Sequence, residues 1–242
     1  MIGVIVELLL SWLLLYYIEH QGLSVLGFRP TRRRSILFGL GLLLTAGYVT
    51  GFYLVESVLL RSPYHANPAY GFRDLLPATW HVITSVLFEE LLFRGALLYI
   101  LIRRIGPSRA VLLSAVAFGC YHWFTTGFGN PKQMIQVFLI TGFAGYAFAR
   151  AYAKTGTLLL PFALHFALNF TAMVIFSHNY GAGNQLLVPA LSPDAIKPAP
   201  WLSLGLFAVY SFGYPLAVLV WLRAVKPSPP AAEPVNINKL VI

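Results

Sequence analysis

The chain has 242 residues, of which 58% are hydrophobic and only 10% are charged, and its mean hydropathy is +0.72. Soluble domains carry about 25% charged residues, so this composition predicts a polytopic membrane protein without a separate soluble domain. The formal net charge of +9 does not require nucleic acid, because basic loops beside apolar spans explain it. We therefore expect membrane lipids, and no nucleic acid, among the partners.

Apolar runs follow one another along the chain, and each is close to the ~20 residues that a helix needs to cross a bilayer. They predict an all-α fold, a polytopic transmembrane helical bundle of about seven spans. The runs are Ile2–Ile18, Ser35–Leu59, Trp80–Ile102, Ala110–Thr126, Gln133–Ala153, Thr157–Phe176 and Trp201–Leu222.

Positive charge is distributed unevenly over the connections between these runs. Arg32, Arg33 and Arg34 follow the first run and further basic clusters follow the third, fifth and seventh, whereas only Arg61 and Arg73 follow the second. Basic residues mark the cytoplasmic side of a membrane protein. We expect an integral protein of a bacterial cell membrane, with the N-terminus outside and the C-terminus in the cytoplasm.

These boundaries divide the chain into five parts. Residues 177–200, between the last two runs, are rich in Gly, Asn and Pro, and residues 223–242 include a Pro-rich stretch. Both compositions favour irregular structure. The parts are N-terminal transmembrane helices and loops (1–79), a core of four helices (80–176), an external loop (177–200), a last transmembrane helix (201–222) and a disordered cytoplasmic tail (223–242).

Three charges interrupt the third run: Glu89 and Glu90 are adjacent, and Arg94 follows one turn later. Each charge near a helix centre costs about 2.5–3.5 kcal/mol on insertion scales, so these groups must face protein or water. The spacing of Glu90 and Arg94 predicts an intrahelical ion pair, which is as consistent with a structural role as with a catalytic one. Glu89 is rotated by about 100° from Glu90, and we expect it to face a cavity as a general base.

Further polar residues lie at a similar depth in the fourth and sixth runs. His122 is in the fourth, where Phe118 precedes it by one turn, and His165 and Asn169 are one turn apart in the sixth. Their distances from the run ends place them all about 15–20 Å from one membrane surface. We therefore expect them to meet Glu89 in one cavity.

Together these groups suit hydrolysis of a peptide bond. Such a reaction needs a base to take a proton from water, and donors for the oxygen that becomes negative. We expect Glu89 to be the base, Asn169 and an N–H of His165 to be the donors, and His122 to orient the water or protonate the leaving amine. Two histidines and one glutamate also form a common zinc set, so Glu89, His122 and His165 are alternative metal ligands.

Three motifs carry a family resemblance. Glu89-Glu90-x-x-x-Arg94, Phe118-x-x-x-His122 and His165-x-x-x-Asn169 resemble the signature of the CPBP family of intramembrane proteases, over about residues 80–176. That family includes the type II CAAX prenyl endopeptidases and proteins linked to bacteriocin processing and self-immunity. The resemblance implies an intramembrane endopeptidase that cleaves a membrane-anchored, prenylated or leader-type, peptide or protein.

The resemblance also assigns roles. Glu89 would activate water with help from His122, His165 and Asn169 would form the oxyanion hole, and Glu90, Arg94 and Phe118 would support them. This mechanism needs no cofactor, and a zinc-dependent version is the alternative.

Two other classes of function remain open. Buried Glu, His and Arg side chains also form proton relays in transporters, although the chain shows no inverted repeat. A non-catalytic immunity or scaffold protein that has kept the family residues is the second alternative. The small residues Gly142 and Gly145 are interpreted as permitting close helix packing.

Overall fold

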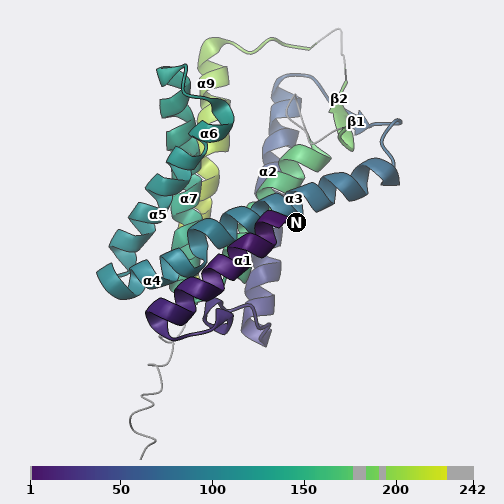
Figure 1. The fold of residues 1–242 in the computed structure, drawn as a ribbon. Coiled ribbons are helices and arrows are strands. Elements are labelled where there is room, and N and C mark those ends of the chain that lie inside the picture. Colours follow the sequence, from purple (N-terminus) through teal and green to yellow (C-terminus); the bar gives the residue numbers. More distant parts are fainter. Residues whose placement is uncertain (1, 177–183, 191–194, 228–242) are drawn as a thin grey trace, which may run out of the picture.

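The computed structural model describes residues 2–176, 184–190 and 195–227, and these form a bundle of helices (Figure 1). The expected all-α architecture is therefore present. Short π-helical turns extend α1, α8 and α9 at their carboxyl ends. The helices are α1 (Ile2–Leu14), α2 (Arg32–Leu59), α3 (Phe72–Arg94), α4 (Ala96–Ile105), α5 (Pro107–Tyr121), α6 (Trp123–Thr126), α7 (Pro131–Thr155), α8 (Leu159–Phe170), α9 (Pro200–Ala208) and α10 (Tyr214–Ala224).

A two-stranded antiparallel ribbon is the exception to the helical fold. It pairs β1 (Tyr64–Ala66) with β2 (Leu187–Pro189). The side-chain amide of Asn67 also donates a hydrogen bond to the carbonyl oxygen of Gln185 at 3.0 Å. The described part of the expected external loop is thus fastened to the connection between α2 and α3. Residues 177–183 and 191–194 of that loop, and 228–242 of the expected tail, lie outside the described residues.

Four helical segments are long and apolar enough to cross a bilayer, which indicates an integral membrane protein. The expected count of seven full spans is not confirmed, because the other apolar runs form shorter or interrupted helices. The segments are Ile2–Glu19, Arg32–Leu59, Pro131–Thr155 and Pro200–Ala224, and a shorter apolar helix covers Leu159–Ile175.

The third apolar run, Trp80–Ile102, is two helices rather than the single span expected from the sequence. α3 and α4 meet at Gly95, where a Cβ atom would stand 2.1 Å from the carbonyl oxygen of Leu91. A side chain cannot occupy that space, so glycine is required at this break. α3 also begins earlier than expected, at Phe72, and Arg73 therefore lies in its first turn rather than in a loop.

The fourth run, Ala110–Thr126, is also interrupted, because α5 ends before His122 and α6 starts after it. The carbonyl oxygen of His122 accepts hydrogen bonds from the hydroxyl groups of Thr125 and Thr126, each at 2.9 Å. The backbone N–H groups of Thr125 and Thr126 donate to the same oxygen, at 3.3 and 3.1 Å, so a new helical turn starts at His122. His122 therefore lies at a helix end instead of in the middle of a span.

Close packing brings α3, α5, α7 and α8 together. α3 runs antiparallel to α8. Glu90, near the carboxyl end of α3, contacts His165 within α8, whereas Val82, earlier in α3, packs in one cluster with Val174, which follows α8. α5 and α7 approach closely at Gly119, where a Cβ atom would lie 2.7 Å from the Phe138 ring. Figure 1 shows α1 and α3 running obliquely to the more upright α2, α5, α7 and α9.

Candidate active site

Arg94, the last residue of α3, is fully buried among the four helices. Its Nη1 donates to Oε1 of Glu90 at 3.0 Å, which confirms the ion pair expected from their spacing. Its Nη2 donates to the carbonyl oxygen of Gly145 on α7 at 3.0 Å. The guanidinium carbon also lies 4.2 Å from the centre of the Phe118 ring, so a cation–π contact from α5 adds to these bonds.

Gly145 contacts the buried cluster directly, whereas the spacing of small residues predicted only close helix packing there. A Cβ atom at Gly145 would lie 2.7 Å from Cδ1 of Phe118 and 3.0 Å from Nη2 of Arg94. The absence of a side chain therefore lets the α7 backbone reach the guanidinium group. The signal in the sequence was the small-residue pair Gly142 and Gly145, but it did not indicate which partner each glycine meets.

We expect Gly145→Ala to destabilise the protein by about 1–3 kcal/mol and to reduce any activity of the site, because the added methyl group would push Phe118 and Arg94 apart. The measurement is denaturation of the purified protein in detergent. Gly142→Ala is the matched control: a Cβ atom there would lie 3.5 Å from the nearest atom, the carbonyl oxygen of Ala115, which is an ordinary contact. Equal stability of the two variants would contradict the proposed close approach.

His165 connects Glu90 to Asn169, and its contact with Glu90 was not predicted from the sequence. Nδ1 of His165 lies 2.8 Å from Oε1 of Glu90, the same oxygen that accepts from Arg94. Nε2 of His165 lies 3.3 Å from Nδ2 of Asn169. The imidazole ring stacks on Phe148 of α7, with ring centres 4.8 Å apart. Glu90 therefore links α3 to α8, because one of its oxygens contacts both Arg94 and His165.

These contacts assign the protons on both imidazole rings. A carboxylate or carbonyl oxygen only accepts, so Nδ1 of His165 donates to Glu90, and Nδ1 of His122 donates to the carbonyl oxygen of Phe118 at 2.8 Å. In the neutral rings Nε2 is then an acceptor. Nε2 of His165 accepts a hydrogen bond from the side-chain amide of Asn169. Nε2 of His122 is left as an acceptor for a ligand.

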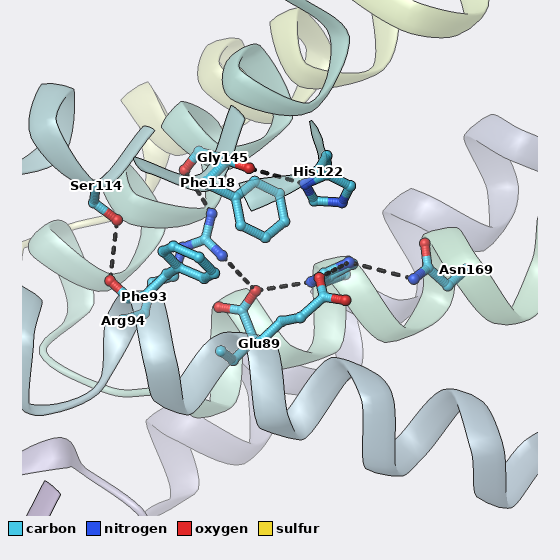
Figure 2. Close-up of polar contacts among 10 residues, drawn as sticks. Glu89, Phe93, Arg94, Ser114, Phe118, His122, Gly145 and Asn169 are labelled. Atoms are coloured by element: carbon cyan, nitrogen blue, oxygen red, sulfur yellow. Dashed lines mark hydrogen bonds and ion pairs between the residues drawn. The ribbon is translucent and has the colours of Figure 1, made fainter. Parts of the chain in front are cut away.

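Glu89 differs from Glu90 in its surroundings. Its side chain is 14% exposed and Oε2 lies 3.7 Å from Nε2 of His165, beyond hydrogen-bonding distance. Oε2 is buried and accepts no hydrogen bond from any described residue, so this oxygen is available to a polar ligand. The Phe118 ring contacts both imidazole rings, with ring centres 4.6 Å from His122 and 5.8 Å from His165. Figure 2 shows Glu89, His122 and Asn169 directed into the region between the helices.

The zinc alternative requires Glu89, His122 and His165 to converge on one point. Within residues 2–176, 184–190 and 195–227, no three His, Cys, Asp or Glu side chains are grouped to hold a metal ion. Both ring nitrogens of His165 are already hydrogen-bonded, to Glu90 and Asn169. In this arrangement the residues do not fit a three-ligand zinc site.

Next to Asn169, a mostly apolar cavity of about 530 Å³ opens between α2, α7, α8 and α9 and the π-helical turns that follow α8 and α9. Glu56 lies at the carboxyl end of α2 in its wall, and Glu89 does not line it. Asn169 is therefore the link between this cavity and the buried polar cluster. The other lining residues include Phe52, Tyr53, Ile140, Leu168, Met173, Phe207, Tyr210 and Tyr214.

The fold and the site define a helical membrane protein in which two carboxylates, two imidazoles, an amide and a guanidinium group are gathered between four helices. Comparison with known families matches residues 71–171 to the family described as type II CAAX prenyl endopeptidase Rce1-like. Residues 71–171 therefore form a domain of the Rce1-like type II CAAX prenyl endopeptidase (CPBP) family. It runs from the residue before α3 to the residue after α8. Comparisons with curated proteins and with solved structures find no match.

Proposed function

We propose that the protein is an intramembrane endopeptidase that hydrolyses a peptide bond in a membrane-anchored substrate with a glutamate-activated water. The family of residues 71–171 suggests a peptidase. The observation that carries the mechanism is the difference between the adjacent glutamates. Oε1 of Glu90 is bonded to both Arg94 and His165, whereas Oε2 of Glu89 accepts no hydrogen bond from a described residue.

In the proposed reaction, Glu89 takes a proton from water while the water oxygen bonds to the carbonyl carbon of the substrate. Nε2 of His122 accepts the second water hydrogen and so orients the nucleophile. The proton held by Glu89 passes to the leaving amine as the C–N bond breaks, which restores the carboxylate. The products are a carboxylic acid and an amine, and no group of the protein is consumed.

Stabilisation of the oxyanion is assigned mainly to Asn169. Neutral His165 has its one N–H directed at Glu90, so it has no donor for the substrate oxygen in this tautomer. Asn169 keeps one N–H beyond the bond to His165. The expected pair of oxyanion donors is thereby modified: His165 positions Asn169 and donates from Nε2 only when the ring is protonated.

The apolar cavity beside Asn169 supports a substrate with an extended hydrophobic group. A volume of about 530 Å³ is in the range of pockets that hold small-molecule ligands, and its aromatic and aliphatic walls suit a lipid chain or apolar side chains. The test is incubation of the full-length protein in proteoliposomes with prenylated, acylated and transmembrane reporter peptides, followed by mass spectrometry of the products. Absence of cleavage in all three sets would contradict the proposal.

Because the mechanism uses no metal ion, we expect proteolysis to survive incubation with EDTA or 1,10-phenanthroline. The measurement is the cleavage rate of the same reporter before and after chelation and removal of the chelator. Loss of cleavage that zinc alone restores would contradict the glutamate mechanism and favour the metal alternative.

A further inference from the structure

A second, smaller cavity of about 240 Å³ lies between α7 and α10, away from the candidate active site. Among the described residues, its wall holds three basic residues, two aliphatic residues and one tyrosine, and no acidic residue. The lining residues are Tyr146, Arg150, Lys154, Leu219, Leu222 and Arg223.

The helix geometry separates the apolar and basic parts of this cavity. α7 and α10 run parallel, since Phe143 contacts Phe212 near one end of the pair and Lys154 reaches Leu222 near the other. Along α7, Tyr146, Arg150 and Lys154 are each one turn apart and share one face. Leu219 and Arg223 have the same spacing on α10. The apolar residues therefore lie deeper along both helices, and the cations lie together at the carboxyl ends.

Lys154 already has a structural role. Its Nζ donates to the carbonyl oxygen of Leu222 at 2.5 Å and to that of Arg223 at 3.4 Å, which caps the carboxyl end of α10. Arg150 and Arg223 have no ion-pair partner among the residues that the structure describes. Two guanidinium groups therefore lie beside one cavity whose described lining holds no carboxylate.

We propose that this cavity binds the phosphate headgroup of an anionic membrane phospholipid. Arg150 and Arg223 donate to the phosphate oxygens from opposite helices, and an acyl chain lies beside Tyr146 and Leu219. Guanidinium groups bind phosphate through paired N–H donors, and basic pockets between transmembrane helices on the cytoplasmic side suit anionic headgroups.

A lipid is favoured over free phosphate by the surface that adjoins the cavity. Leu216 and Val220 of α10 are more than half exposed, so the outer face of this helix is apolar where a chain would extend. The same end of the molecule carries Arg33, which donates to the carbonyl oxygen of Lys226. Such a gathering of cations is typical of the cytoplasmic side, where anionic lipid attracts basic residues.

The test is titration of delipidated full-length protein in neutral detergent with phosphatidylglycerol, phosphatidylcholine or glycerol phosphate, with bound ligand counted by native mass spectrometry. We expect selective binding of phosphatidylglycerol. Since each basic residue contributes about five-fold to anionic lipid binding, Arg150→Gln/Arg223→Gln should weaken it about 25-fold. Arg150→Lys/Arg223→Lys should retain most of the affinity and shows whether the site tolerates substitution.

The matched control is Arg29→Gln/Arg109→Gln, which removes the same charge from two exposed arginines outside the cavity. It should bind phosphatidylglycerol as the wild type does. Equal losses in both double variants would overturn the proposal in favour of general surface attraction. Equal binding of glycerol phosphate, or unchanged lipid binding by Arg150→Gln/Arg223→Gln, would also overturn it.

Discussion

Glu89→Gln is expected to lower the rate of peptide cleavage by about 10²–10⁴-fold while leaving a folded protein, because the amide keeps the size of the side chain but cannot take a proton from water. Glu89 makes no ion pair with Arg94, and its nearest imidazole nitrogen is 3.7 Å away, so the substitution removes little from the packed cluster. The measurement is single-turnover cleavage of a membrane-tethered reporter, with unfolding of the same sample in parallel.

The matched control is Glu7→Gln, which neutralises a half-buried carboxylate of α1 that forms no ion pair with the cluster among the described residues. Its cleavage rate should remain within a few-fold of the wild-type rate. If Glu89→Gln cleaves as fast as Glu7→Gln, Glu89 is not the base. If both variants lose activity together with stability, the loss reports folding and not chemistry.

The local part of the candidate site could be predicted from the sequence because a helix turn fixes which side chains meet. Glu90 with Arg94, and His165 with Asn169, are pairs separated by four residues, and both pairs are in contact in the structure. The same reasoning identified adjacent glutamates with different neighbours. Spacing within one helix, however, carries no information about which residue of another helix comes closest.

The contacts between helices that organise the site could therefore not be predicted from the sequence. The bond of His165 to Glu90 and the bond of Arg94 to the Gly145 carbonyl oxygen join α3 to α8 and α7, and both depend on tertiary packing. The helix breaks were missed for a related reason. Hydropathy is continuous across Gly95 and His122, although the helices end there. The Leu91 carbonyl oxygen leaves no room for a side chain at Gly95, and a new helical turn starts at His122.

Glu90→Gln is expected to cost about 3–5 kcal/mol of stability, because it leaves the fully buried guanidinium group of Arg94 without a counter-charge. Arg94→Gln should cost less. Glu90 keeps the N–H of His165 as a partner at 2.8 Å. Arg94 without Glu90 keeps only one carbonyl oxygen and neighbouring aromatic rings. The measurement is denaturation of each variant in detergent.

The double variant Glu90→Gln/Arg94→Gln separates the ion pair from simple loss of packing. With both charges removed, no unpaired charge stays buried, so its cost should be smaller than the sum of the single costs. Arg103→Gln is the matched control. This substitution breaks the ion pair between Arg103 and Glu19, in which the arginine side chain is 36% exposed. Exposed ion pairs contribute about 0–1 kcal/mol to the free energy of unfolding. Additive costs in the double variant, or a Glu90→Gln cost no larger than that of Arg103→Gln, would mean that Glu90 does not hold Arg94 in place. A large coupling would instead identify the pair as the support that keeps His165 and Asn169 aligned beside Glu89.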